Sequence, residues 1–305
     1  MQTNPLAATL WMLGAMLIIG FIDNLIGAMA AEIGLWQFFV MRTAVAVPVI
    51  LLMPLVGLGA LRVVRWRWVA LRSLLSASAM LCYFGALGLM SIAEALAGLY
   101  TAPIFILLFG LVAGQGFGPW RALAVGMGFA GVLLVLQLGG GGLTGLVLLP
   151  VLGGALYALG AMVTRSHCAG ESPVALLLAV MGLQGALSAC VLIAMAVTDT
   201  AGTEYLTRGW VWPVSPASWG VIVVQGLGSL MAVYGIVRAY QLAEPSLVSV
   251  IEYSVMVFGP LFALWLFGDV ISPMQGAGIA LIVTAGLVIA WRARVAARVA
   301  ARVAD

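Results

Sequence analysis

Residues 246–268 read SLVSVIEYSVMVFGPLFALWLFG, an apolar run long enough to cross a bilayer that nevertheless contains one carboxylate, Glu252. A membrane span needs roughly 20 apolar residues to cross about 30 Å of hydrocarbon. The whole chain has this character, since 64% of its 305 residues are hydrophobic, 8% are charged and the mean hydropathy is +1.20. A soluble domain is about a quarter charged. The composition therefore predicts an all-α polytopic membrane protein, because long continuous apolar runs are typical of helices and not of barrel strands.

Charged residues, prolines and glycines divide the chain into apolar segments that are each long enough to cross the bilayer. No room is left for a large soluble domain between them. The first segment follows no basic region, so it predicts a membrane helix and not a cleaved signal peptide. The ten predicted spans are residues 6–30, 35–57, 69–90, 92–114, 120–138, 145–164, 173–197, 217–240, 243–267 and 274–292.

All 13 basic residues are arginines, and they are distributed unevenly around these spans. Most lie on one face of the membrane or in the tail, whereas Arg208 lies on the opposite face with several acidic residues. Because cytoplasmic connections carry an excess of arginine, both termini are predicted to be cytoplasmic. The tail RARVAARVAARVAD (292–305) predicts a basic helical stripe that rests on anionic headgroups. We therefore expect membrane lipid, and no nucleic acid, as its partner.

The two halves of the chain resemble each other in sequence. Each half has five predicted spans, and two similar units with an odd number of crossings must lie upside down relative to one another. The sequence thus predicts a 5+5 inverted repeat, with units at 1–143 and 144–292 and a basic cytoplasmic tail at 293–305. The matching stretches are 91–114 with 241–269 and 120–136 with 274–290, and the pair Ala93-Glu94 corresponds to Ala243-Glu244.

Several of these stretches resemble the EamA type of the drug/metabolite transporter (DMT) superfamily. They are WLFGDVISPMQGAGIALIVTAGLVI (265–289), GQGFGPWRALAVGMGFAGVLLVL (114–136), the two Ala-Glu pairs and Arg42. The resemblance covers nearly the whole chain. It implies ten helices in two five-helix units and an inner-membrane permease that moves small metabolites, most often outward, by alternating access. The YddG-type members imply amino acids, including aromatic ones, as substrates.

The residues that are missing exclude several other functions. Without lysine there is no retinal Schiff base and no phosphate-binding GK[ST] loop. His167, the only histidine, lies beside Cys168 without a third group to orient such a pair. The three cysteines show no C-x-x-C spacing, so neither a disulfide framework nor a metal site is indicated. We expect no enzymatic activity, no metal and no cofactor.

Glu252 needs a physical explanation, because a charge at the bilayer centre costs from about 2.5 kcal/mol upward. If its helix enters from the cytoplasm near residue 243, Glu252 lies about 14 Å deep, where inverted-repeat transporters bind substrate. Either it contacts a substrate ammonium or titrates a coupling proton, or it is a neutral, hydrogen-bonded structural acid. Arg42 and Asp23 lie about 10–12 Å below the outer surface on consecutive helices. One expectation is structural, with Arg42 either paired with Asp23 or capped by another polar group. The alternative is that Arg42 binds an anion such as a substrate carboxylate.

Tyrosines recur inside the spans that the resemblance places around a central cavity. Each combines a flat apolar face with a polar tip, which suits an amphipathic solute. The alternative is that they belong to a lipid-facing aromatic belt. Pro103 and Pro260 are expected to bend spans four and nine. The predicted substrate-binding residues are Asn24, Arg42, Tyr83, Tyr100, Tyr157, Gln225, Tyr234, Glu252 and Tyr253.

Several functions remain open on the sequence. The preferred prediction is an inner-membrane exporter of amino acids, with a small molecule as its partner and the monomer as its working unit. The alternatives are an importer of a cationic metabolite such as S-adenosylmethionine, a proton-coupled drug efflux pump that uses Glu252, and a non-transporting membrane scaffold. A scaffold needs no polar groups at mid-depth, which favours a transporter.

Overall fold

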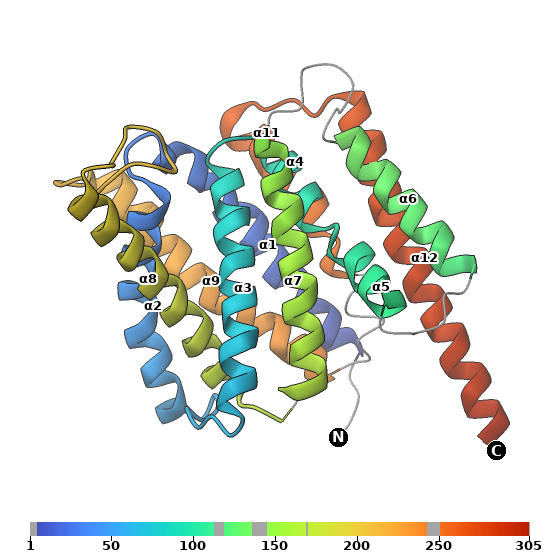
Figure 1. Ribbon diagram of the computed structural model, residues 1–305. Coiled ribbons are helices and arrows are strands. Elements are labelled where there is room, and N and C mark those ends of the chain that lie inside the picture. Colours follow the sequence, from blue (N-terminus) through green and yellow to red (C-terminus); the bar gives the residue numbers. More distant parts are fainter. Residues whose placement is uncertain (1–4, 113–118, 136–144, 169, 243–250, 305) are drawn as a thin grey trace.

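Long apolar helices make up the fold, as the composition predicts. The computed structural model describes residues 5–112, 119–135, 145–168, 170–242 and 251–304 (Figure 1). Within these ranges, six helices are long and apolar enough to cross a membrane, and four shorter apolar helices accompany them. Each of these helices overlaps one of the ten predicted spans, so the chain is an all-α polytopic membrane protein.

The helix boundaries follow the breaks expected from proline, glycine and charge. Several of the helices begin at a proline, which lacks the donor that the first turn leaves unpaired anyway. In chain order the elements are α1 (Pro5–Ala30), α2 (Leu35–Leu52), η1 (Met53–Val56), α3 (Trp66–Leu87), α4 (Ile92–Leu99), α5 (Ala102–Val112), α6 (Pro119–Val135), η2 (Gly145–Val147), α7 (Leu148–His167), α8 (Pro173–Thr198), α9 (Pro216–Leu242), α11 (Val255–Phe267) and α12 (Pro273–Ala304).

Spans four and nine are interrupted within the membrane region. In span four, α4 ends before Tyr100 and α5 begins after Thr101, whose Oγ1 donates to the Gly98 carbonyl at 2.6 Å. In span nine, a turn at Tyr253 and Ser254 precedes α11. Neither interruption is centred on the proline that the sequence indicated. Pro103 is the second residue of α5, and Pro260 lies inside α11.

Most of the packing is between helices that are far apart in the sequence. Along their lengths α1 packs on α9, α3 on α7, α2 on α8 and α6 on α12 (Figure 1). In addition, α11 lies against α1 and α4 lies against α7. Every one of these pairs joins a helix before residue 143 to a helix after it. The helices α1 and α9 correspond to predicted spans one and eight, and α7 and α3 correspond to spans six and three. Exchanging each span for the one five positions away in the order of ten therefore converts the α1/α9 pair into the α7/α3 pair.

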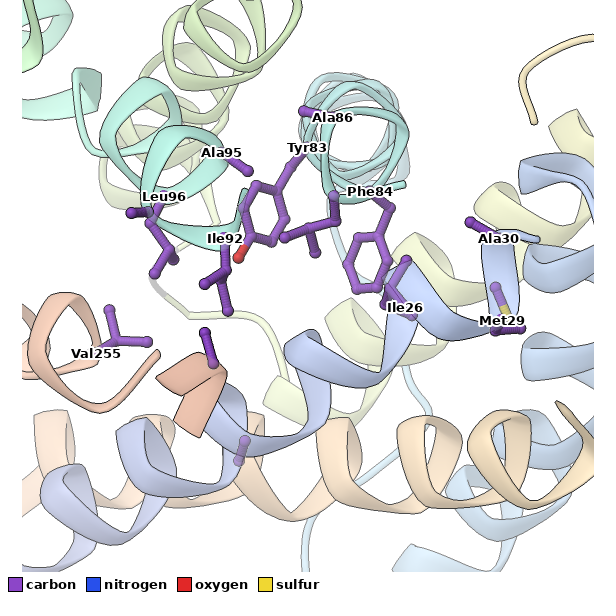
Figure 2. Close-up of a cluster of buried hydrophobic side chains, with 14 of the residues drawn as sticks. Ile26, Met29, Ala30, Tyr83, Phe84, Ala86, Ile92, Ala95, Leu96 and Val255 are labelled. Carbon is purple, nitrogen blue, oxygen red and sulfur yellow. The ribbon is translucent and has the colours of Figure 1, made fainter. Parts of the chain in front are cut away.

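The centre of the fold is an apolar core with closely approaching backbones around it. Figure 2 shows side chains of α1, α3 and α4 converging, among them Tyr83 and Ile92, with Val255 of α11 nearby. At the α6/α12 crossing, a Cβ at Gly131 would lie 2.7 Å from the carbonyl oxygen of Gly278. Only glycine fits there, as expected where helix association in lipid depends on close packing.

Candidate functional site

A buried polar cluster joins α1, α2, α3 and α9. The Asp23 carboxylate on α1 accepts a hydrogen bond from Tyr83 Oη on α3 at 2.8 Å and another from Gln225 Nε2 on α9 at 2.9 Å. On α2, Arg42 Nη2 donates to Ser229 Oγ of α9 at 2.9 Å. Asp23, Arg42 and Gln225 are 5%, 6% and 0% exposed. The fold thus brings together Arg42, Tyr83 and Gln225, three of the residues predicted from the sequence.

Arg42 is held differently from the ion pair that the sequence allowed. No salt bridge joins it to Asp23 in the described part of the chain, although their charges attract each other. The guanidinium is capped by a hydroxyl and surrounded by aromatic rings, which stabilise a cation through their faces. From Arg42 Cζ the ring centroids lie at 6.0 Å for Phe38, 5.6 Å for Phe39 and 5.0 Å for Phe84.

The cluster leaves several of its own polar atoms without a partner. Within the described residues, Arg42 Nε, Arg42 Nη1 and Gln225 Oε1 are buried and accept or donate no hydrogen bond. Each buried unpaired group costs about 1–3 kcal/mol, and more if it is charged. Native proteins contain few such groups, and each of them needs an explanation, such as a functional role or a bound water or ion.

A second cluster surrounds Glu252 where spans four and nine are interrupted. The rings of Tyr100 and Tyr253 lie 5.6 Å apart, one from each interrupted span. The Glu252 carboxylate interacts electrostatically with both hydroxyls and with Tyr157 of α7. Tyr157 is 40% exposed and Glu252 is half-buried, so this cluster is open to its surroundings. Tyr100 also interacts with Asp23, which connects the two clusters.

The two remaining predicted residues lie outside these clusters. Asn24 Nδ2 donates to the carbonyls of Gly20 at 2.6 Å and Gly259 at 2.9 Å. Both amide hydrogens are thereby used, and Asn24 fixes α1 against α11. Tyr234 lines a cavity of about 270 Å³ between η1 with the segment that follows it, α8 and α9, and packs edge-to-face on Trp11 with ring centroids 6.0 Å apart.

Sequence reasoning missed Ser229, which holds Arg42 in place. The signal was available, because Ser229 lies four residues after Gln225 and therefore on the same face of α9. The Ser229 hydroxyl accepts from Arg42 and donates to the backbone carbonyl of Gln225.

Among the described residues, no three His, Cys, Asp or Glu side chains converge as metal ligands would.

Two further carboxylates, missed by the sequence reasoning as functional residues, close the ends of the fold. Where α1 meets α2, Glu32 accepts hydrogen bonds from the backbone and hydroxyl of Ser215 and from the hydroxyl of Ser218. Ser215 directly precedes α9. The Ser215 hydroxyl, followed by Ser218, holds the pKa of Glu32 below its ordinary value of 4.5. We call this arrangement the Glu32 clasp.

The Glu171 clasp has the same design at the opposite end of the fold. Glu171, 8% exposed, accepts from the backbone N–H of Val64 at 2.9 Å and of Arg65 at 2.7 Å. Arg65 directly precedes α3. The next residue, Ser172, accepts from the backbone N–H of Ala60 at 3.1 Å. Figure 1 shows the α1–α2 and α2–α3 connections at opposite ends of the helices. Each carboxylate thus binds at the N-terminus of a distant helix, where negative charge is favourable.

These features define a polytopic, all-α membrane protein with charged and tyrosine side chains buried along its interior, the architecture of a small-metabolite membrane transporter. Comparisons with known proteins agree. Residues 6–137 match the EamA-like transporter family. The chain is thus similar to EamA-type permeases of the drug/metabolite transporter superfamily, the similarity that its sequence motifs predict.

Relatives with assigned functions and a solved structure extend this similarity. A riboflavin transporter of Rhizobium johnstonii is 28% identical over 235 residues, which cover 76% of this chain and 73% of that protein. A riboflavin transporter of Vibrio cholerae serotype O1 is 24% identical over 286 residues, covering 92% and 91%. A solved structure titled only "Crystal structure of protein" is 21% identical, covers 94% of this chain and 97% of its own, and has a TM-score of 0.64, which indicates the same fold.

Proposed function

We propose that this protein is a secondary transporter that carries a small, neutral, aromatic metabolite across the cell inner membrane by alternating access. The observation that carries the proposal is the polar path from Arg42 and Asp23 through Tyr83 and Tyr100 to Glu252. Charged side chains at such depth in a membrane protein mark solute or proton pathways. A non-transporting scaffold needs no such path.

Two inverted halves, 1–143 and 144–292, are part of this proposal. The packing supports it, because an inverted repeat requires that each contact between two spans recur between the spans five positions later. The α1/α9 pair recurs as α7/α3, and α1/α11 recurs as α7/α4. The Glu32 clasp, at the start of α9, recurs as the Glu171 clasp at the start of α3. The interruption at Tyr100 recurs at Tyr253.

The arginine distribution favours a cytoplasmic location for the Glu171 clasp and both termini. Glu252 then lies in the path near mid-membrane, where a carboxylate that faces an open cluster is suited to carry a coupling proton. We propose proton coupling through Glu252 on this basis.

Riboflavin is the first candidate substrate, because both relatives described above carry that name. Its flat ring system suits the tyrosine faces along the path, and its hydroxylated chain suits their polar tips. An amino acid is the second candidate, since the opposite charges of Asp23 and Arg42 match a zwitterion. A cationic solute is disfavoured, because it would be repelled by the Arg42 guanidinium.

Transport by purified protein in liposomes tests the proposal. The solutes are labelled riboflavin, phenylalanine and S-adenosylmethionine, and the variants are Arg42→Gln and Glu252→Gln, with exposed Glu204→Gln as a matched control. We expect saturable riboflavin flux in the parent and the control, reduced at least about tenfold in Arg42→Gln. If no solute crosses under any gradient while the helical circular dichroism is unchanged, the protein is not a carrier. If S-adenosylmethionine alone crosses and Glu252→Gln abolishes its flux, a cation pump replaces the present proposal.

A further inference from the structure

Among the described residues, Arg42 Nε, Arg42 Nη1 and Gln225 Oε1 are buried without a hydrogen-bond partner. Both oxygens of Asp23 are occupied, one by Tyr83 and one by the Gln225 amide nitrogen. Ser229 Oγ accepts from Arg42 Nη2 and donates to the backbone carbonyl of Gln225, one turn earlier on α9. The rings of Phe38, Phe39 and Phe84 beside the guanidinium carry no hydrogen-bond acceptor. A solute that enters the cluster would supply the missing partners of these atoms.

The chemistry of the missing partner follows from the atoms that are free. Arg42 Nε and Nη1 need acceptors, whereas Gln225 Oε1 needs a donor. Ser229, which accepts from Arg42 Nη2, lies one helical turn after Gln225 on the same face of α9. An acceptor beside a donor on one ligand would therefore serve both side chains. The charges of Asp23 and Arg42 already balance within the cluster. A simple anion would leave Gln225 Oε1 unpaired and add negative charge near Asp23, and a simple cation would be repelled by Arg42.

We infer that Arg42 and Gln225 form the specificity subsite of this transporter. They bind an edge of the substrate that has no net charge and that presents a hydrogen-bond acceptor beside a donor. The inference rests on the proposed function and specifies its substrate chemistry. Two kinds of solute carry such an edge. One is the imide of a flavin ring, with its N3–H between two carbonyl groups, and the other is the ammonium and carboxylate of an amino acid.

The position of the subsite fits a gated carrier. Its residues come from α1, α2 and α9, and α3 covers it through the Tyr83 hydrogen bond to Asp23. In the described state the free atoms are inaccessible. Movement of α3 away from α1 uncovers them, and a solute with the right edge then satisfies all three. A solute without the donor leaves Gln225 Oε1 unpaired, so the subsite discriminates against such a solute.

The test uses transport in liposomes with paired probes that differ by one hydrogen-bonding group. Riboflavin is compared with 3-methylriboflavin, which lacks the N3–H, and phenylalanine with 3-phenylpropionate, which lacks the ammonium and has no other donor. The proteins are the parent, Gln225→Met, and Gln184→Met as a matched control with a buried glutamine elsewhere, on α8. Melting in detergent checks that each variant is folded.

We expect methylation at N3 to lower the riboflavin transport efficiency of the parent and of Gln184→Met by about tenfold or more. In Gln225→Met the transport efficiencies of riboflavin and 3-methylriboflavin should differ by less than about threefold, because the variant has no side-chain acceptor for the N3–H. The same pattern with phenylalanine and 3-phenylpropionate supports the subsite with an amino acid as the solute. Equal transport of both members of each pair by the parent overturns the subsite and leaves the proposed function standing, whereas absence of any flux overturns the function itself. If Gln225→Met does not fold, the comparison in the parent alone decides.

Discussion

The Glu171 clasp gives a quantitative expectation for the connection between α2 and α3. Glu171→Ala leaves the backbone N–H groups of Val64 and Arg65 without their carboxylate partner. A hydrogen bond to a charged group contributes about 1.5–3 kcal/mol, and the lower value applies because Val64 and Arg65 are exposed. Losing two such bonds weakens the closed connection by about 3 kcal/mol. At about 1.4 kcal/mol per factor of ten, the open form becomes about 100-fold more populated.

Trypsin reports this opening, because the connection and the start of α3 carry Arg62, Arg65 and Arg67. When opening is faster than cleavage, the cleavage rate follows the open population. We expect Glu171→Ala in detergent to be cut in this segment about 100-fold faster than the parent. Glu171→Gln, which keeps one acceptor oxygen, should be intermediate. The control is Glu204→Ala. A cleavage rate in Glu171→Ala within about twofold of that control would refute the reasoning.

Three other predictions follow from the same contacts. Tyr83→Phe removes one of the two hydrogen bonds to buried Asp23 and should destabilise the protein by about 1–3 kcal/mol, measured as a lower unfolding midpoint in detergent, whereas an unchanged midpoint would contradict the role of this bond. The pKa of Glu32 is lowered by Ser215 and Ser218, so the Glu32 clasp stabilises the fold fully above pH 4.5 and loses its effect as the pH falls through the folded pKa. Glu32→Gln should flatten the acid limb of the stability profile, and a parent-like acid limb in that variant would exclude the clasp as its cause. Gly153→Cys should form a disulfide with Cys82 on oxidation, because a Cβ at position 153 lies 3.3 Å from the Cys82 Cβ, whereas Gly126→Cys should stay reactive to maleimide.

The helices themselves could be predicted from the sequence because the apolar runs are long and the breaks between them are polar. The interruptions at Tyr100 and Tyr253 could not be placed in this way. Hydropathy does not register a broken turn, since residues on both sides remain apolar. Pro103 and Pro260 lie in the two spans that are interrupted, but neither lies at the interruption itself. A proline at the start of α5 disturbs no hydrogen bond of that helix, and Pro260 is accommodated within α11.

The candidate site was predicted in part, by depth and residue type. Arg42 and Gln225 were selected as polar groups at depth, and the structure places both in one cluster. Their partner Ser229 was overlooked because serine is common in membrane helices. The Glu171 clasp was beyond sequence reasoning, since Glu171 and Val64 are 107 residues apart. Asn24 was predicted to bind substrate, but its side chain holds α1 against α11 instead. A buried amide is equally suited to either role, so residue type and depth could not separate them.

The contacts also constrain how the path opens. A movement of residues 1–143 against 144–292 as blocks would unpack α1 from α9 and α3 from α7 and break both clasps at once. A movement of the α1/α9 pair against the α3/α7 pair would break neither clasp. Within the Asp23 cluster, the Gln225 bond lies inside the α1/α9 pair, and the Tyr83 bond alone crosses to α3. If the protein opens by the proposed alternating access, separation of the two mixed pairs spares both clasps and breaks the bond between Tyr83 and Asp23.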